Sequence, residues 1–93
     1  MKISIVIPCY NESKTINNVY EKVSNFKNLE KEIIIIDDCS TDGSRKIIEK
    51  IAESDPNVKV IFKDQNQGKG SALKEGFKLV KMFVIIVNIL FAR

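Results

Sequence analysis

Four consecutive isoleucines at residues 33–36, with Glu32 before them and Asp37 after them, constrain the fold of this chain more than any other feature. Successive side chains of a strand point to opposite faces, so an unbroken β-branched run suits a strand that is buried on both faces. Such strands lie at the centre of parallel sheets that carry helices on both sides. The run therefore predicts a central strand over residues 32–37 in an α/β fold.

The other apolar segments alternate between strand and helix patterns. Residues 2–8, 58–62 and 83–90 are typical of strands, and Ser13 or Asn11 can cap a first helix that runs to about Phe26. The inward positions of the three predicted helices are Ile16, Val19, Val23 and Phe26; Ile47, Ile48, Ile51 and Ala52; and Ala72, Leu73, Gly76, Phe77 and Val80. Strands and helices that alternate at this spacing imply right-handed βαβ units. We therefore predict a Rossmann-like three-layer α/β sandwich with a mostly parallel sheet in the strand order 3-2-1-4.

Composition supports one soluble domain and excludes several classes of function. The 93 residues are 44% hydrophobic and 29% charged, which is ordinary for a globular protein. Cys9 and Cys39 follow no metal-binding spacing and form no disulfide framework, so we expect free thiols in the cytoplasm, with the cytoplasmic membrane face as a further location. We expect no secretory signal in this stretch, because the first apolar run is too short for one and ends at Pro8. A basic stripe interleaved with aromatic residues is missing, so we expect no nucleic-acid partner.

The charge distribution divides the chain into two regions. All 12 acidic residues lie before residue 76, whereas Lys78, Lys81 and Arg93 follow without an acid and give the net charge of +3. We expect residues 1–81 to form a βαβ region that binds a ligand, and residues 82–93 to be an apolar tail with an edge strand. An apolar edge strand invites self-association. Met82 to Ala92 is too short to span a bilayer as a helix.

Three polar clusters follow the first three predicted strands, at residues 8–12, 37–43 and 66–72. Ligands of open parallel sheets bind beyond the carboxyl ends of the strands, which is where these clusters are expected to meet. Any one cluster alone is equally well explained as turn and cap chemistry. Asp37 and Asp38 are harder to explain in that way, because two adjacent carboxylates beside isoleucines suffer desolvation and like-charge repulsion. Since neighbouring strand residues point to opposite faces, one acid can face a ligand while the other braces the neighbouring loop.

Taken together, the three clusters resemble those of the family 2 glycosyltransferases, the dolichyl-phosphate sugar transferases especially. The motifs are Pro-x-Tyr-Asn-Glu, Asp-Asp-x-Ser-Thr-Asp-Gly and Asn-x-Gly-Lys-Gly-x-Ala-x-x-x-Gly, and the match runs from Lys2 to about Val80. The resemblance implies the nucleotide-binding half of a GT-A fold. It also implies transfer of a sugar from a UDP- or GDP-sugar to a lipid phosphate, such as a membrane-bound polyprenyl phosphate, or to a glycan.

The same resemblance assigns roles to six residues of the nucleotide-sugar site. It implies that Pro8, Tyr10 and Glu12 line the nucleoside pocket. Ile36 is then expected to supply backbone and apolar contact, and Asp38 to accept hydrogen bonds from the base. Lys69 is expected to approach the diphosphate from its glycine loop. A tyrosine ring can stack on any base, and a carboxylate that accepts from base N–H groups forms a charge-assisted bond.

Two departures from the family pattern affect the expected activity. Cys39 stands where the family usually has glycine, which is tolerable if the backbone there keeps a negative φ. The Asp-x-Asp motif that holds Mg²⁺ or Mn²⁺ in the intact family is absent, since the last acid is Glu75. We therefore expect no metal and no catalytic residue within these 93 residues, and no sugar transfer by them alone. The change in composition near Val80 favours a truncated or frameshifted product, with a non-catalytic nucleotide-binding remnant or a partner-completed module as the alternative.

Other nucleotide-binding families fit less well. A dinucleotide oxidoreductase needs Gly-x-Gly-x-x-Gly at the first turn, where this chain has no glycine. A P-loop is excluded because Gly68-Lys69-Gly70 lacks the Gly-Lys-Ser/Thr ending. A phosphoacceptor receiver domain carries its acid pair after the first strand, whereas the pair here follows the second.

Overall fold

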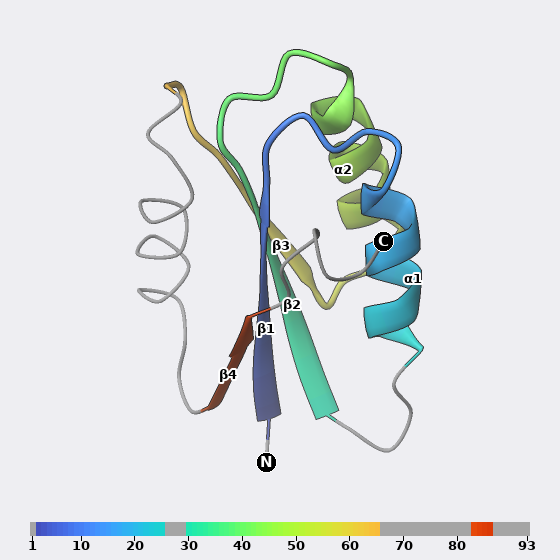
Figure 1. The fold of residues 1–93 in the computed structure, drawn as a ribbon. Coiled ribbons are helices and arrows are strands. Elements are labelled where there is room, and N and C mark those ends of the chain that lie inside the picture. Colours follow the sequence, from blue (N-terminus) through green and yellow to red (C-terminus); the bar gives the residue numbers. More distant parts are fainter. Residues whose placement is uncertain (1, 26–29, 66–82, 87–93) are drawn as a thin grey trace.

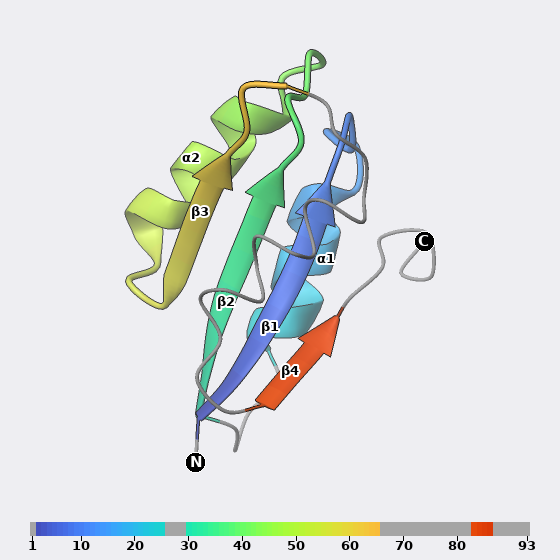
Figure 2. The ribbon, with the colours of Figure 1, turned by 90° about the vertical axis from the view of Figure 1, so that its left-hand side faces the viewer.

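The structure, a computed structural model, describes residues 2–25, 30–65 and 83–86. Four strands and two helices follow one another along the chain: β1 (Lys2–Cys9), α1 (Ile16–Ser24), β2 (Glu30–Asp37), α2 (Ser44–Ser54), β3 (Val58–Phe62) and β4 (Phe83–Ile86). The strands form one sheet in the order β3-β2-β1-β4 (Figure 2). Every pairing is parallel, so the predicted fold and strand order are confirmed.

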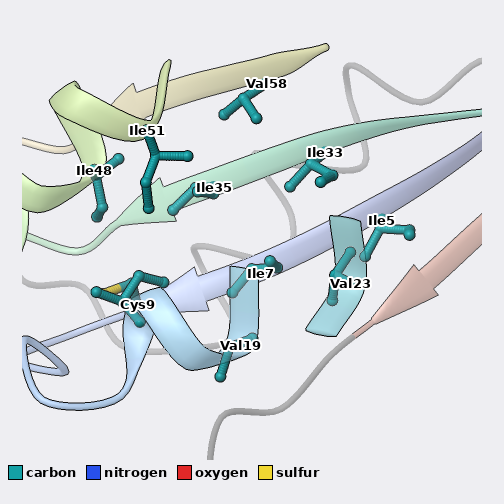
Figure 3. Packing of buried hydrophobic residues seen from close by; sticks show 11 residues of the cluster. Ile5, Ile7, Cys9, Val19, Val23, Ile33, Ile35, Ile48, Ile51 and Val58 are labelled. Atoms are coloured by element: carbon teal, nitrogen blue, oxygen red, sulfur yellow. The ribbon is translucent and has the colours of Figure 1, made fainter. Parts of the chain in front are cut away.

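Helices α1 and α2 both cover one face of the sheet (Figure 1). Their apolar sides pack on the side chains that β1 and β2 direct toward them, and the resulting core is shown in Figure 3. Its buried members are Ile5, Ile7, Cys9, Ile16, Val19, Val23, Ile33, Ile35, Ile48, Ile51 and Val58. Fully burying one such aliphatic side chain contributes about 1.5–3 kcal/mol, so this face supplies much of the stability of the fold.

The opposite face of the sheet is also covered. Val6, Ile34 and Ile36 point there, and each is 0% exposed. All four isoleucines of β2 are thus buried, as their unbroken run predicts. The third helix predicted from Ala72 to Val80 lies outside the described residues.

One predicted boundary differs from the structure. Helix α1 has Thr15 at its N-cap, and neither Asn11 nor Ser13 caps it. The side chain of Asn11 is held by the loop after β2 instead, because its Oδ1 accepts from the Thr41 N–H, and the Ser13 N–H donates to Asp42 Oδ2 in the same loop. The helix ends at Ser24, with Asn25 as its C-cap, close to the predicted end at about Phe26, and Phe26 itself lies outside the described residues. Strand β4 is described only for Phe83–Ile86, so residues 87–90 of the predicted strand lie outside the description.

Candidate nucleotide-binding site

The first two polar clusters lie side by side at the carboxyl ends of β1 and β2. Cys9 and Asp37 are register neighbours at the last paired positions of these strands, so Tyr10 and Asp38 leave the sheet at the same edge. Both loops are at the top of Figure 1. This is the edge at which parallel α/β sheets bind their ligands.

Hydrogen bonds join the loop after β1 to the loop after β2. The Asn11 N–H donates to Ser40 Oγ at 2.9 Å, and the Thr41 N–H donates to Asn11 Oδ1 at 2.7 Å. The Glu12 N–H donates to Ser44 Oγ at 3.0 Å, at the start of α2. Each such bond stabilises the folded state by only about 0.5–1.5 kcal/mol. Together they fix the two loops as one unit.

Asp42 is the acid that connects this unit to the first turn of α2. Its carboxylate accepts from the Ser44 N–H at 3.0 Å and from Ser44 Oγ at 2.5 Å, as well as from the Ser13 N–H at 3.0 Å. Burial alone would raise the pKa of this carboxyl, but the hydrogen bonds from Ser44 and Ser13 outweigh it and lower the pKa to about 2. Asp42 is therefore ionised at neutral pH and serves as a structural acceptor.

Asp37 points to the helix face of the sheet and braces the loop, which is one of the two roles that the sequence leaves open for this acid pair. Its side chain is fully buried, and Oδ2 accepts from the Ser40 N–H at 3.0 Å and from Arg45 Nε at 2.8 Å. The guanidinium of Arg45 also donates through Nη2 to the Lys63 carbonyl, and its Cζ lies 5.2 Å from the centre of the Phe62 ring. Arg45 therefore ties the end of β2 to the end of β3. Arg45 could not be expected from the sequence, because nothing in the local pattern shows that α2 reaches β3.

Asp38 points to the opposite face, together with Ile36. Its N–H donates to the Cys9 carbonyl at 2.9 Å, which fixes its backbone against β1. Its Oδ1 lies 3.8 Å from Lys63 Nζ, and the two side chains are only 4% and 9% exposed. Lys63 was also missed, although it continues the alternation of β3 onto the face that Asp38 shares.

The other predicted site residues differ in their access to solvent. Tyr10 is 44% exposed and offers an open ring. Pro8 and Ile36 are buried, as is Asp38. Glu12 is partly buried, and its Oε2 accepts from Thr15 Oγ1 at 2.9 Å. Lys69 lies outside the described residues.

A negative φ at Cys39, the condition under which a cysteine is tolerable at this position, is not met. Its φ is +64°, in the left-handed region, and Asn11 at +50° is the other non-glycine residue with a positive φ in the described ranges. The loop after β2 must turn sharply because Asp38 is held by Cys9 while Ser40 is held by Asp37. The family's glycine suits this turn, and a cysteine there is strained.

The second cysteine, Cys9, is part of the core. Burial raises the pKa of its thiol to about 12, and the nearby charge of Asp37 acts in the same direction. The thiol therefore stays protonated and packs as a small apolar group. Both cysteines are free, as predicted.

Comparison with known proteins identifies the family. The family model described as glycosyl transferase family 2 matches residues 4–87. The chain belongs to glycosyl transferase family 2. Poly-beta-1,6-N-acetyl-D-glucosamine synthase of Staphylococcus aureus is 44% identical over 78 residues, which are 82% of this chain and 18% of that protein. The same-named protein of Staphylococcus epidermidis is 40% identical over 76 residues. This family 2 chain thus spans 18% of the length of these relatives.

Solved structures agree with this assignment. S. aureus TarS 1-349 in complex with UDP-GlcNAc superimposes with a TM-score of 0.82 at 32% identity, covering 96% of this chain and 26% of that one. The mannosyltransferase PcManGT of Pyrobaculum calidifontis, in complex with GDP-Man and Mn²⁺, has a TM-score of 0.83 at 22% identity over 94% of this chain and 27% of its own. The predicted fold, that of the GT-A glycosyltransferases, is thereby confirmed.

A divalent cation of the kind named for PcManGT does not fit the residues described in this chain. Within residues 2–25, 30–65 and 83–86, no group of three His, Cys, Asp or Glu side chains could hold a metal ion. Asp37 is engaged by Arg45, and Asp38 lies beside Lys63. The described residues therefore support no metal-dependent step.

Two further observations concern other surfaces. A groove of about 330 Å³ lies between α1 and α2, away from the loops, and is lined by Asn17, Tyr20, Glu21, Ile47, Lys50, Ile51 and Ser54. In the part of the chain that the structure describes, no helix is long and apolar enough to cross a bilayer.

Proposed function

We propose that this chain binds the nucleotide of a UDP-linked sugar at the carboxyl ends of β1, β2 and β3, as the nucleotide-binding region of a glycosyltransferase. The observation that carries the proposal is the joining of the Tyr10 loop to the Asp38 loop by hydrogen bonds between the loops. A binding site needs side chains that are positioned before the ligand arrives, and these two loops meet that condition. The open ring of Tyr10 and the carboxylate of Asp38 supply the two contacts that a base requires.

Each predicted residue has a role in this proposal. Tyr10 stacks on the base, and Asp38 accepts from a base N–H. Pro8 and Ile36 form the apolar layer beneath the base. Glu12 lines the pocket and, through Thr15, steadies the start of α1. Lys69 approaches the diphosphate from the glycine loop after β3.

The base and the acceptor are proposed from the relatives. TarS, which was solved in complex with UDP-GlcNAc, and the synthase named for poly-beta-1,6-N-acetyl-D-glucosamine support a UDP-linked sugar over a GDP-linked one. The second name also supports a glycan acceptor. The resemblance to dolichyl-phosphate sugar transferases would instead predict a polyprenyl phosphate at the cytoplasmic membrane face. An assay of sugar transfer distinguishes the glycan acceptor from the polyprenyl phosphate acceptor. It measures transfer from a labelled sugar nucleotide to each acceptor by a protein that spans the relatives' full length.

Binding and transfer are expected to be separable in these 93 residues. Their sequence contains no Asp-x-Asp. We propose that the chain alone binds the nucleotide without transferring sugar, and that binding changes little with Mg²⁺ or Mn²⁺. Product above blank in a radiolabelled sugar-nucleotide assay with the chain alone would contradict this part of the proposal.

Isothermal titration calorimetry tests the binding site. UDP is expected to bind saturably, and Tyr10→Ala is expected to weaken binding about tenfold, because stacking on one base contributes about 1–3 kcal/mol. Tyr20→Phe is the matched control, since Tyr20 lies in the α1–α2 groove. Asp38→Asn is expected to weaken UDP binding more than Asp37→Asn, because Asp37 points to the helix face. Equal losses for the two acids, or tighter binding of GDP than of UDP, would refute the assignment.

A further inference from the structure

Lys63 is a charged side chain that neither the sequence motifs nor the family resemblance assigns to the site. It follows β3 directly, and its Nζ lies 3.8 Å from Asp38 Oδ1. Its side chain is 9% exposed, although lysine is rarely buried without a reason. A charge held this deep in a protein is expensive unless charged or polar groups surround it.

The backbone of Lys63 is held firmly on both sides. Its N–H donates to the Asp37 carbonyl at 2.9 Å, and its own carbonyl accepts from Arg45 Nη2. Arg45 is in turn anchored to Asp37 Oδ2 at 2.8 Å. Asp38 is fixed as well, through its N–H bond to the Cys9 carbonyl. The ammonium and the carboxylate are therefore presented from rigid backbone, which is what selective recognition requires.

The spacing of the two charged groups suits a ligand edge with neighbouring donor and acceptor. At 3.8 Å, Nζ and Oδ1 lie beyond hydrogen-bond distance from each other. One edge of a base complements both groups if an N–H faces the carboxylate and an adjacent carbonyl faces the ammonium. Uracil has this arrangement, with N3–H beside O4.

Cytosine carries the reverse arrangement at the same two positions. Its N3 is an acceptor and its exocyclic N4 is a donor. In the pose that suits uracil, the N3 lone pair would face Asp38 and the amino group would face Lys63, so both contacts would be repulsive. The preference for uracil would then come as much from the polar groups that cytosine leaves unpaired as from the hydrogen bonds that uracil forms.

We infer that Lys63 is a specificity-determining residue of the nucleotide site. Its ammonium donates to the base carbonyl, while Asp38 accepts a hydrogen bond from the neighbouring base N–H. Lys63 thereby selects uridine diphosphates over cytidine diphosphates. The inference rests on the proposed UDP-sugar site and adds a residue and a selectivity to it. Lys63 acts on the base in this account and makes no contact with the diphosphate.

Calorimetric titration of UDP and CDP into the 93-residue chain tests the inference. The wild type is expected to bind UDP at least about tenfold more tightly than CDP, since a bidentate polar contact contributes about 1–3 kcal/mol of discrimination between bases. Lys63→Met should weaken UDP binding about tenfold and bring the ratio of the two affinities near one. Lys63→Arg should retain most of the preference. Lys59→Met is the matched control, because Lys59 lies on the same face of β3 but pairs with Glu32 at 3.3 Å.

Each outcome supports or overturns the inference. A wild type that binds neither nucleotide would overturn both the inference and the proposed site. A wild type that binds UDP, combined with a Lys63→Met variant that keeps the UDP-to-CDP ratio, would overturn the inference alone. Equal weakening of UDP and CDP by Lys63→Met would also overturn it, since that result assigns Lys63 to the phosphates.

A test without a variant covers the case in which Lys63→Met fails to fold. 4-Thio-UDP keeps the N3–H and replaces O4 by the weaker acceptor sulfur. It should bind the wild type several-fold more weakly than UDP, and equal affinity would overturn the inference.

Discussion

Replacing Cys39 by glycine is predicted to stabilise the protein. At a φ of +64°, the Cβ of Cys39 is close to the following carbonyl oxygen, which costs about 1–2 kcal/mol relative to a right-handed conformation. Glycine removes this strain, but its more flexible unfolded chain offsets about 0.4–1 kcal/mol of the gain. The substitution also removes a weak contact from Cys39 Sγ to the Asp64 carbonyl at 3.4 Å. The net gain is therefore about 0.5–1 kcal/mol, which corresponds to a rise of roughly 4 °C in Tm for a chain of this size.

Thermal and urea denaturation of the wild type and three variants measure this effect. Cys39→Ala is the control, because it removes the sulfur and keeps the strained Cβ, and it should lie close to the wild type. Cys39→Val should be less stable than either, since β-branched residues are genuine outliers at positive φ. A Cys39→Gly variant no more stable than Cys39→Ala would show that strain at this turn is not what distinguishes the chain from its family pattern.

Three further predictions concern the groups around the site. Arg45→Met should destabilise the fold by about 3 kcal/mol in urea denaturation, because it leaves the fully buried carboxylate of Asp37 without its cation; a loss below 1 kcal/mol would contradict this. Cys9 should resist alkylation at pH 8 while Cys39 reacts, as mass spectrometry can show, because burial raises the Cys9 pKa to about 12; labelling of both thiols at equal rates would contradict it. The folded-state pKa of Asp42 is lowered to about 2, so the ionised carboxylate stabilises the fold above pH 4 and this effect is lost as the pH falls toward 2. Asp42→Asn should lack this part of the dependence of Tm on acid pH. A variant whose Tm falls with pH as the wild type's does would contradict the prediction.

The strands could be predicted from sequence because their patterns are local. The unbroken isoleucines of β2 are buried whichever face they point to, so one run of residues fixes a central strand. Because successive side chains of a strand point to opposite faces, Asp37 and Asp38 also point to opposite faces. This alternation distinguishes the acid that braces the loop from the acid on the face of the site.

The missed features depend on contacts between distant segments. Arg45 matters because α2 passes over the end of β3, and Lys63 matters because β3 lies next to β2. The positive φ of Cys39 results from the hydrogen bonds that the N–H groups of its neighbours Asp38 and Ser40 donate. Residue propensities cannot predict such bonds. Asn11 is an ordinary N-cap residue by type, but its side chain bonds to Thr41, 30 residues away. In each case a tertiary contact overrides the local preference.

We propose above all that a UDP-linked sugar binds where the loops after β1, β2 and β3 meet. The most direct measurement is a ¹H–¹⁵N NMR titration of the 93-residue chain with UDP. We predict saturable shifts at the amides of Tyr10, Asp38 and Lys63, with little change at Tyr20 and Lys50 in the α1–α2 groove. Shifts confined to that groove, or no saturable shift at the three loop residues, would contradict the account.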